Sequence, residues 1–284
     1  MKIKLMNSGA MPLKIVWMGQ QEDISLHDHP FYELVVVFDG EGIHVCGLEE
    51  YRIGAGDIFL LKPGIAHGYR QTENLELVNI LYQPENLNLN LYDLGTLPGY
   101  HAFFEFEPAM RRQHGFSGRM RLNGEYLDAL HHLVVQLRDE LKNIGNGGLF
   151  SGVAYLMQIF IFISRNYSGM KNPVQMDLLR LGATLAYIRA HCTRPLTLED
   201  ISRKAAMSQS TLYRVFMKAV GMSPVNYVIS QRLALAKQLL ADSDEEISSI
   251  AQQSGFSDSN YFSRLFHRHA GQTPSDYRRK FRHL

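Results

Sequence analysis

The chain has 284 residues, of which 45% are hydrophobic and 20% are charged, so it can form two globular domains and is not expected to be disordered. Its net charge of +1 is unevenly distributed: residues 1–173 contain 14 Lys and Arg against 19 Asp and Glu, whereas residues 174–284 contain 15 against 9. The most apolar stretch, residues 153–164, is shorter than the roughly 18 residues that suggest a membrane helix, and it lacks the flanks of a signal peptide. We therefore expect a cytoplasmic protein with no membrane partner and a basic C-terminal part that can bind a polyanion.

Short runs of apolar and β-branched residues, separated by Gly, Asp and Pro, occupy residues 14–82. The runs read KIVW, ELVVVF, GIHVC, DIFLL and LELVNILY. Strands at this spacing are typical of an antiparallel β-barrel or jelly roll. We expect a barrel domain of this kind over residues 1–120.

Two motifs in this region contain residue types that bind metal ions. His27, His29 and Glu33 form HxHxxxE, and His67 follows Pro-Gly-x-x. Both motifs resemble those of the cupin fold, although Gln21 stands where that fold has a glycine. The resemblance implies a cupin-like barrel, and three imidazoles with one carboxylate could bind Zn, Fe, Ni or Mn. No metal cofactor is required by the sequence, and the same residues could instead contact a sugar or be structural.

A barrel mouth with apolar walls and a few convergent polar groups is a common small-molecule site. The candidate ligand-binding residues are aromatic, imidazole or carboxylate side chains, and Trp17 is a possible stacking platform for a sugar ring. Alternatively, Trp17 and Tyr32 are core aromatics and His44 faces outward. The candidates are Trp17, His29, Tyr32, Glu33, His44, His67 and Tyr69.

Two helices are predicted after the barrel, at residues 125–143 and 149–167. Apolar residues in the first follow a 3–4 spacing, which is typical of a helix that packs against another helix. Its partner could be the same helix of a second protomer or the barrel of its own chain. We assign residues 121–167 to a dimerisation segment and residues 168–175 to a linker. The apolar residues of the first helix are Leu127, Leu130, Val134, Leu137 and Leu141.

Residues 201–227 are repeated as residues 250–277, with one residue inserted just after a predicted turn. Each copy is expected to contain a helix, a short turn and a second helix. Capping patterns predict that the first helix starts at Thr197, with Asp200 as its capping partner, in one copy, and at Ser243, with Glu246, in the other. The repeated residues are Ile201, Met207 and Ser208, which recur 49 positions later as Ile250, Phe256 and Ser257, and Arg214, Phe216, Gly221, Pro224 and Tyr227, which recur 50 positions later as Arg264, Phe266, Gly271, Pro274 and Tyr277.

The second helix of each copy has an apolar face and a polar face. Serines are expected to cap these helices, and the polar faces can reach base edges or phosphates in the major groove. The apolar residues are Leu212, Val215 and Phe216, and Phe262, Leu265 and Phe266. The expected DNA-contacting residues are Ser208, Gln209, Ser210, Tyr213 and Arg214, and Ser257, Ser259, Asn260, Ser263 and Arg264.

A predicted helix from Pro224 to about Ala241 separates the two copies, because proline favours the first helical position. Its length of about 27 Å approaches the roughly 34 Å between successive major-groove segments on one face of a duplex. The spacing favours double-stranded DNA as the partner.

The C-terminal residues resemble the DNA-binding domain of the AraC/XylS family of transcription regulators. The resemblance rests on GFSDSNYFSRLF at residues 255–266, followed by Gly271, Thr273-Pro274 and Tyr277-Arg278. It implies an all-α DNA-binding domain over residues 176–284, with two helix-turn-helix units that read bases through their second helices. It also implies a homodimer and activation of transcription through contact with RNA polymerase.

Residues 79–100 and the barrel segment 54–67 resemble regulators of L-rhamnose operons, which implies a sugar effector such as L-rhamnose. Together these inferences describe an α+β two-domain protein: a cupin-like antiparallel barrel with a helical pair, then a double helix-turn-helix domain. We expect a sequence-specific transcription regulator with no catalytic residue, and not an enzyme. The alternatives are a metal-dependent cupin enzyme fused to a DNA-binding module, and a regulator controlled by a protein partner.

Overall fold

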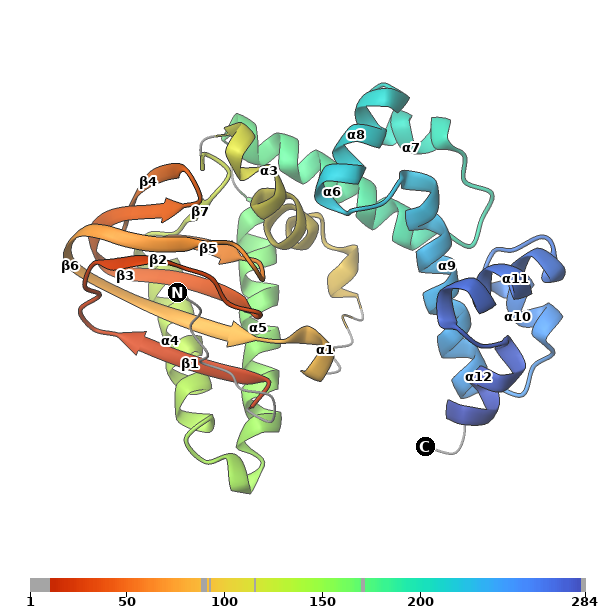
Figure 1. Cartoon of the computed structure of the whole chain (residues 1–284), viewed down its shortest axis with the longest axis horizontal. Helices are drawn as coiled ribbons and strands as arrows, with labels where there is room; N and C mark the ends of the chain where they lie inside the picture. Colours follow the sequence, from red (N-terminus) through yellow and green to blue (C-terminus); the bar gives the residue numbers. More distant parts are fainter. Residues whose placement is uncertain (1–10, 88–90, 92, 115, 170–171, 282–284) are drawn as a thin grey trace. The chain divides into compact units, whose positions relative to one another are not determined.

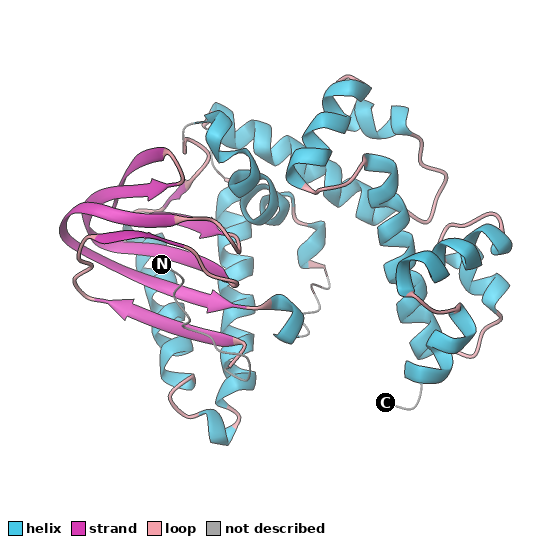
Figure 2. Cartoon of the chain, in the orientation of Figure 1, coloured by secondary structure: helices cyan, strands magenta, loops and turns pink. Residues whose placement is uncertain are grey.

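A computed structural model describes residues 11–87, 91, 93–114, 116–169 and 172–281 and divides the chain into two compact units, residues 1–183 and 184–284 (Figure 1). All strands of the described residues belong to the first unit, and the second unit is helical (Figure 2). This confirms the predicted α+β organisation with an antiparallel sheet domain before an all-α domain.

The first unit contains one seven-stranded antiparallel sheet in the order β1-β6-β3-β5-β7. In addition, β2 pairs with β6, and β4 pairs with β3. The strands are β1 (Leu13–Met18), β2 (Ile24–His27), β3 (Tyr32–Cys46), β4 (Glu49–Gly54), β5 (Asp57–Leu61), β6 (His67–Tyr82) and β7 (Met120–Arg121).

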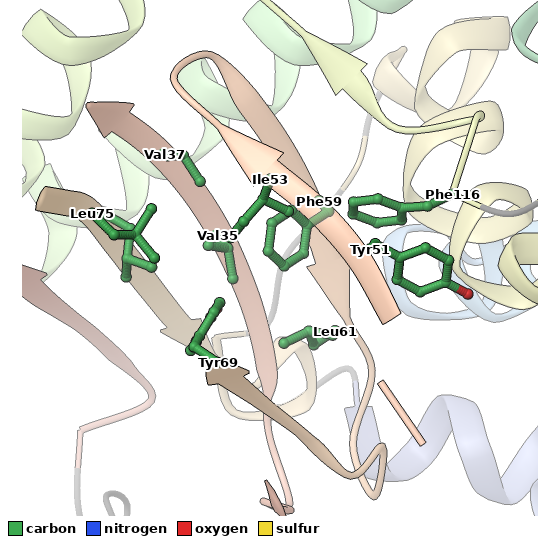
Figure 3. Close-up of a cluster of buried hydrophobic side chains, with 10 residues drawn as sticks. Val35, Val37, Tyr51, Ile53, Phe59, Leu61, Tyr69, Leu75 and Phe116 are labelled. Carbon is green, nitrogen blue, oxygen red and sulfur yellow. The ribbon is translucent and has the colours of Figure 1, made fainter. Parts of the chain in front are cut away.

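The two long strands β3 and β6 bend where their register shifts, between Val37 and Ile43. Gly40 lies in this bend at φ +70°, and a Cβ there would come within 2.2 Å of the Asn74 carbonyl oxygen, so only glycine fits. Because of the bend, side chains from the two halves of the sheet meet in one core, as Figure 3 shows. The described part of the sheet is therefore barrel-like, as predicted. This core contains Val35, Val37, Tyr51, Ile53, Phe59, Leu61, Tyr69, Leu75, Leu77 and Phe116.

Short helices follow the sheet and lead to two long ones, α4 (Gly124–Glu140) and α5 (Gly148–Ser168), which lie side by side along the sheet (Figure 1). Both confirm the predicted helical pair. Leu130, Val134 and Leu137 of α4 are fully buried in their own unit. The apolar stripe of α4 is therefore occupied by contacts within the chain. The shorter elements are α1 (Pro84–Leu87), η1 (Leu94–Thr96), α2 (Pro98–Tyr100), η2 (His101–Phe106), α3 (Glu107–His114) and η3 (Ile144–Asn146).

Among the described helices, α5 is the one long and apolar enough to cross a membrane by length and composition alone. The sequence stretch that we considered, residues 153–164, is shorter than this helix because polar residues interrupt the apolar run. Leu156, Ile159, Phe160 and Ile163 are buried, and the helix packs against α2 and α4. These contacts are typical of the core helix of a globular unit.

The division between the units lies inside α6 (Pro173–His191), later than the predicted linker at residues 168–175 and the domain start at 176. The first half of α6 belongs to the first unit: the Gln175 side chain donates to the Arg119 carbonyl oxygen at 2.7 Å. A Cβ on Gly182 would come within 2.1 Å of the Pro98 carbonyl oxygen, so the backbones touch there. Long-range packing, which local composition does not reveal, therefore moves the boundary.

The second unit contains the two predicted helix-turn-helix copies, α7–α8 and α10–α11, joined by α9. Thr197 and Asp200 form the predicted capping box of α7, and α9 begins at Pro224 as predicted. Ser243 is not a cap of α10, because its hydroxyl donates to the Leu239 carbonyl oxygen at the end of α9. The helices are α7 (Leu198–Ala205), α8 (Gln209–Ala219), α9 (Pro224–Asp242), α10 (Ile247–Gln253), α11 (Ser259–Ala270) and α12 (Pro274–Phe281).

Candidate DNA interface and ligand site

The second helix of the first copy, α8, has one buried face and one exposed face. Leu212 and Phe216 are fully buried, whereas Tyr213 is 52% exposed despite its aromatic ring. Ser208 caps the helix as predicted, since its Oγ accepts the Thr211 N–H at 3.2 Å. This cap has no charge, so a phosphate could bind at the helix N-terminus. All the predicted contact residues of this copy are exposed: Ser208, Gln209, Ser210, Tyr213 and Arg214.

The second helix of the second copy, α11, is capped by Asp258 and not by Ser257, so that prediction was wrong. One carboxylate oxygen of Asp258 accepts the N–H groups of Asn260 and Tyr261, each at 2.8 Å. The residue inserted in this copy moves the capping position one step along the chain, and a carboxylate there interacts favourably with the helix dipole. Its charge also disfavours a phosphate at the N-terminus of α11.

The exposed face of α11 carries the remaining predicted contact residues, with one exception. Ser263 is half-buried, and its hydroxyl donates to the Ser259 carbonyl oxygen at 2.9 Å. Three further exposed residues extend the same surface and were missed from the sequence, although each lies three or four positions from Arg264 on the helix. The exposed predicted residues are Ser257, Ser259, Asn260 and Arg264, and the added ones are Tyr261, His267 and Arg268.

Five of the predicted ligand-binding residues meet on the inner face of the curved sheet in the first unit. His44 pairs with Tyr69 across β3 and β6, and its ring centroid lies 5.4 Å from that of Tyr69 and 6.1 Å from that of His67. His29 and Glu33 join them, with 2.7 Å between His29 Nε2 and Glu33 Oε2. All five side chains are buried: His29, Glu33, His44, His67 and Tyr69.

Burial disfavours the charged forms of His44, His67 and Tyr69. It lowers the pKa of His67 to about 4 and lowers the pKa of His44 well below its usual value, while it raises the pKa of the Tyr69 hydroxyl. Neither ring nitrogen of His44 has a hydrogen-bond partner among the described residues, nor does the Tyr69 hydroxyl. Buried polar atoms without partners are costly, and a ligand rich in hydroxyl groups could satisfy them.

Trp17 and Tyr32 lie on the other face of the sheet, away from this cluster. Trp17 stacks on Phe38 at a centroid distance of 5.6 Å, and the Arg138 guanidinium of α4 lies over its ring. Tyr32 stacks on Tyr82 at 5.4 Å. The structure therefore does not place these two residues with the other candidates, and their contacts are those of aromatic residues in a sheet–helix interface.

Three of the four predicted metal-binding residues have converging ligand atoms. One atom each from His29, Glu33 and His67 lies within 4.8 Å of the other two, and all three residues are buried. His27 is outside this set: its ring centroid is 4.3 Å from that of His67, but its Nδ1 contacts the Ser25 carbonyl oxygen. His67 Nε2 has no hydrogen-bond partner among the described residues, and His29 Nε2 faces the Glu33 carboxylate at 2.7 Å, so the donor set fits a metal ion.

Two helix-turn-helix units with exposed polar helices, on a chain with a separate buried polar site, define a DNA-binding transcription regulator with a ligand-binding domain. The sequence model of the AraC-like ligand binding domain matches residues 13–150, and that of a helix-turn-helix domain matches residues 201–280. The chain belongs to the AraC family of transcription regulators.

Relatives of this chain match along almost its whole length. It is 32% identical over 275 residues to the HTH-type transcriptional activator RhaR of Yersinia pestis bv. Antiqua (strain Angola), covering 96% of this chain and 91% of that protein. RhaR of Mannheimia succiniciproducens is 29% identical over 270 residues, covering 95% and 92%. Among solved structures, the DNA-binding domain of AdpA in complex with a target DNA is 29% identical, covers 37% of this chain and 94% of that chain, and has a TM-score of 0.36.

Proposed function

We propose that this regulator activates transcription when a small sugar binds the buried cluster of the first unit, and that L-rhamnose is the first candidate. The polar atoms of His44 and Tyr69, buried without partners, support a hydroxyl-rich ligand. The activators named RhaR, to which the chain is similar throughout, support the choice of sugar and the activating role.

The observation that supports the DNA-binding mode is the matched pair of exposed helices, α8 and α11. They are joined by α9, whose 19 residues span about 28 Å. A rod of this length suits two successive major-groove segments, which are about 34 Å apart. We infer that one chain contacts two short elements of a duplex, through Tyr213 and Arg214 at one and Asn260 and Arg264 at the other.

A homodimer would double these elements and match a repeated DNA site. Because the apolar stripe of α4 is buried within its own unit, the dimer contact would use other residues. Exposed apolar side chains of the helical pair are candidates: Tyr126 near the start of α4, Ile144 between the two helices and Phe150 at the start of α5. We further infer a contact with RNA polymerase, action in the cytoplasm and no enzymatic activity.

The decisive experiment is selection of bound duplexes from random DNA by the full chain, with L-rhamnose, with D-glucose and without sugar. We expect a site with two elements per chain and stronger enrichment with L-rhamnose. Arg264→Ala should relax the preference at one position, whereas Arg165→Ala, an exposed arginine of α5, should leave the selected site unchanged. Enrichment of no sequence would contradict the DNA-binding mode, and equal enrichment under all three conditions would contradict the sugar.

A further inference from the structure

Three buried ligand atoms point at one another on the inner face of the sheet. His29 Nε2 lies 2.7 Å from Glu33 Oε2, and His67 Nε2 lies 3.7 Å from the same oxygen. The three side chains are 2%, 1% and 5% exposed for His29, His67 and Glu33. Water therefore has little access to this point, and the three atoms must be satisfied by one another or by something between them.

The second ring nitrogen of each histidine fixes where its proton lies. His29 Nδ1 is 2.8 Å from the Phe31 carbonyl oxygen, and His67 Nδ1 is 3.1 Å from the Ile65 carbonyl oxygen. A carbonyl oxygen only accepts, so each Nδ1 carries the hydrogen, and in the neutral ring the Nε2 then presents a lone pair. A backbone carbonyl on the distal nitrogen is the usual outer partner of a metal-bound histidine.

Two lone pairs and a carboxylate facing one another would repel. A proton on His29 Nε2 could satisfy one contact with Glu33, but at 3.7 Å it would leave His67 Nε2 unsatisfied. A cation between the three atoms would satisfy all of them. Metal bonds of about 2.0 to 2.2 Å place the ligand atoms of one ion roughly 3 to 3.5 Å apart. The observed separations of 2.7 and 3.7 Å lie on either side of that range.

We propose that His29, Glu33 and His67 bind one divalent transition-metal ion, in the class of zinc, nickel and cobalt that imidazole ligands favour. Three protein ligands leave at least one coordination position open. An oxygen of the effector would complete the coordination beside His44 and Tyr69. This last step rests on the proposed function, whereas metal binding itself does not depend on it.

The test uses the full chain, purified without a histidine tag and stripped of metal with a chelator. Zinc and cobalt chloride are titrated separately, with calorimetry for zinc and the visible absorption of cobalt as a direct report of coordination. We expect about one ion per chain. Glu33→Gln and His67→Gln should weaken zinc binding more than about ten-fold. His27→Gln is the matched control, since it removes a neighbouring imidazole outside the ligand set, and it should bind zinc like the parent chain.

Folding is checked by the far-UV circular dichroism and the unfolding temperature of each metal-free protein, so that loss of binding is separated from loss of structure. If the parent chain binds no zinc or cobalt, or if folded Glu33→Gln and His67→Gln variants bind as tightly as the parent, the metal site is overturned. L-rhamnose is then titrated into metal-free and zinc-loaded chain. Equal sugar binding in both would overturn the effector contact alone, and sugar binding in neither would count against the sugar while leaving the metal site intact.

Discussion

The two helix-turn-helix units have equivalent hydrophobic cores but differ at the residues where their second helices begin. Phe216 contacts Tyr227 in one copy at a centroid distance of 6.1 Å, and Phe266 contacts Tyr277 in the other at 5.4 Å, at positions 50 residues apart. The caps differ: Ser208 is neutral, whereas Asp258 is a carboxylate. The two copies therefore have the same packing but differ in the chemistry at the N-termini of their second helices.

Because their caps differ, the two copies need not contact DNA in the same way. A neutral cap leaves the N-terminus of α8 suited to a phosphate, whereas the Asp258 charge repels one. Two positions that are exposed on α8 differ too: Ser210 and Tyr213 correspond to Asn260 and Ser263 on α11, whereas Arg214 and Arg264 are equivalent. We expect α11 to contribute more base recognition and α8 more contact with the DNA backbone.

Truncation of the buried phenylalanine in each of the two equivalent cores should have the greatest effect on stability. Phe216→Ala and Phe266→Ala should each lower the free energy of unfolding of the second unit by about 3 to 5 kcal/mol, because each ring is fully buried. Urea denaturation followed by circular dichroism measures this loss. Met217→Ala is the control, since Met217 is 42% exposed and its loss should cost less than about 1 kcal/mol. A small effect at only one of the two phenylalanines would show that the cores are not equivalent.

Substitution of the exposed arginines tests which helix recognises bases and which contacts the DNA backbone. Arg264→Ala should cost about 1 to 3 kcal/mol on the selected site and little on random duplex, because a base contact depends on sequence. Arg214→Ala should weaken binding to both duplexes alike and reduce the salt dependence, as loss of a phosphate contact does. Fluorescence anisotropy at several salt concentrations separates the two results. The reverse pattern would assign base recognition to α8.

Features that depend on neighbours along the chain could be predicted from the sequence. The capping box at Thr197, the cap at Ser208 and the proline that begins α9 all act within one helical turn, and each is where the sequence placed it. The cap of α11 could not be predicted in this way, because the inserted residue leaves two good capping residues, Ser257 and Asp258, and only the geometry of the turn decides between them.

The buried cluster could be predicted only in part, because its members meet through strand register. Strict alternation along β3 would place His44 on the face opposite Glu33, Val35 and Val37. The register shifts between Val37 and Ile43 reverse the alternation, so His44 returns to the inner face. Trp17 pairs with Val78 in an unbroken register, and its contacts with Phe38 and with Arg138 of α4 place it on the outer face. No local sequence pattern reveals which face of the sheet the helices cover.

A smaller effect is expected at the caps, where charge and hydrogen bonding can be separated. Asp258→Ala should cost about 1 kcal/mol of stability because the first-turn N–H groups lose their acceptor. Asp258→Asn keeps an acceptor and removes the charge, so it should bind DNA more tightly by up to about 1 kcal/mol, and Ser208→Asp should bind more weakly by a similar amount. Urea denaturation measures the stability loss of Asp258→Ala, and DNA binding at low and high salt measures the affinity changes of Asp258→Asn and Ser208→Asp. If Asp258→Asn changes neither affinity nor its salt dependence, no phosphate lies near that terminus.

The smallest expected effect concerns Ser263, which the sequence placed among the base contacts. Its hydroxyl donates to the Ser259 carbonyl oxygen one turn earlier, so its hydrogen is engaged and the side chain is half-buried. Ser263→Ala should change both the free energy of unfolding and the DNA affinity by less than about 0.5 kcal/mol. Asn260→Ala removes an exposed side chain on the same helix, and because Asn pairs best with adenine it should cost about 1 to 3 kcal/mol on a site with adenine at that position. A comparable loss for Ser263→Ala in the same anisotropy assay would mean that the hydroxyl turns to the DNA on binding, and the contact surface of α11 would then reach further toward the core than its exposed residues indicate.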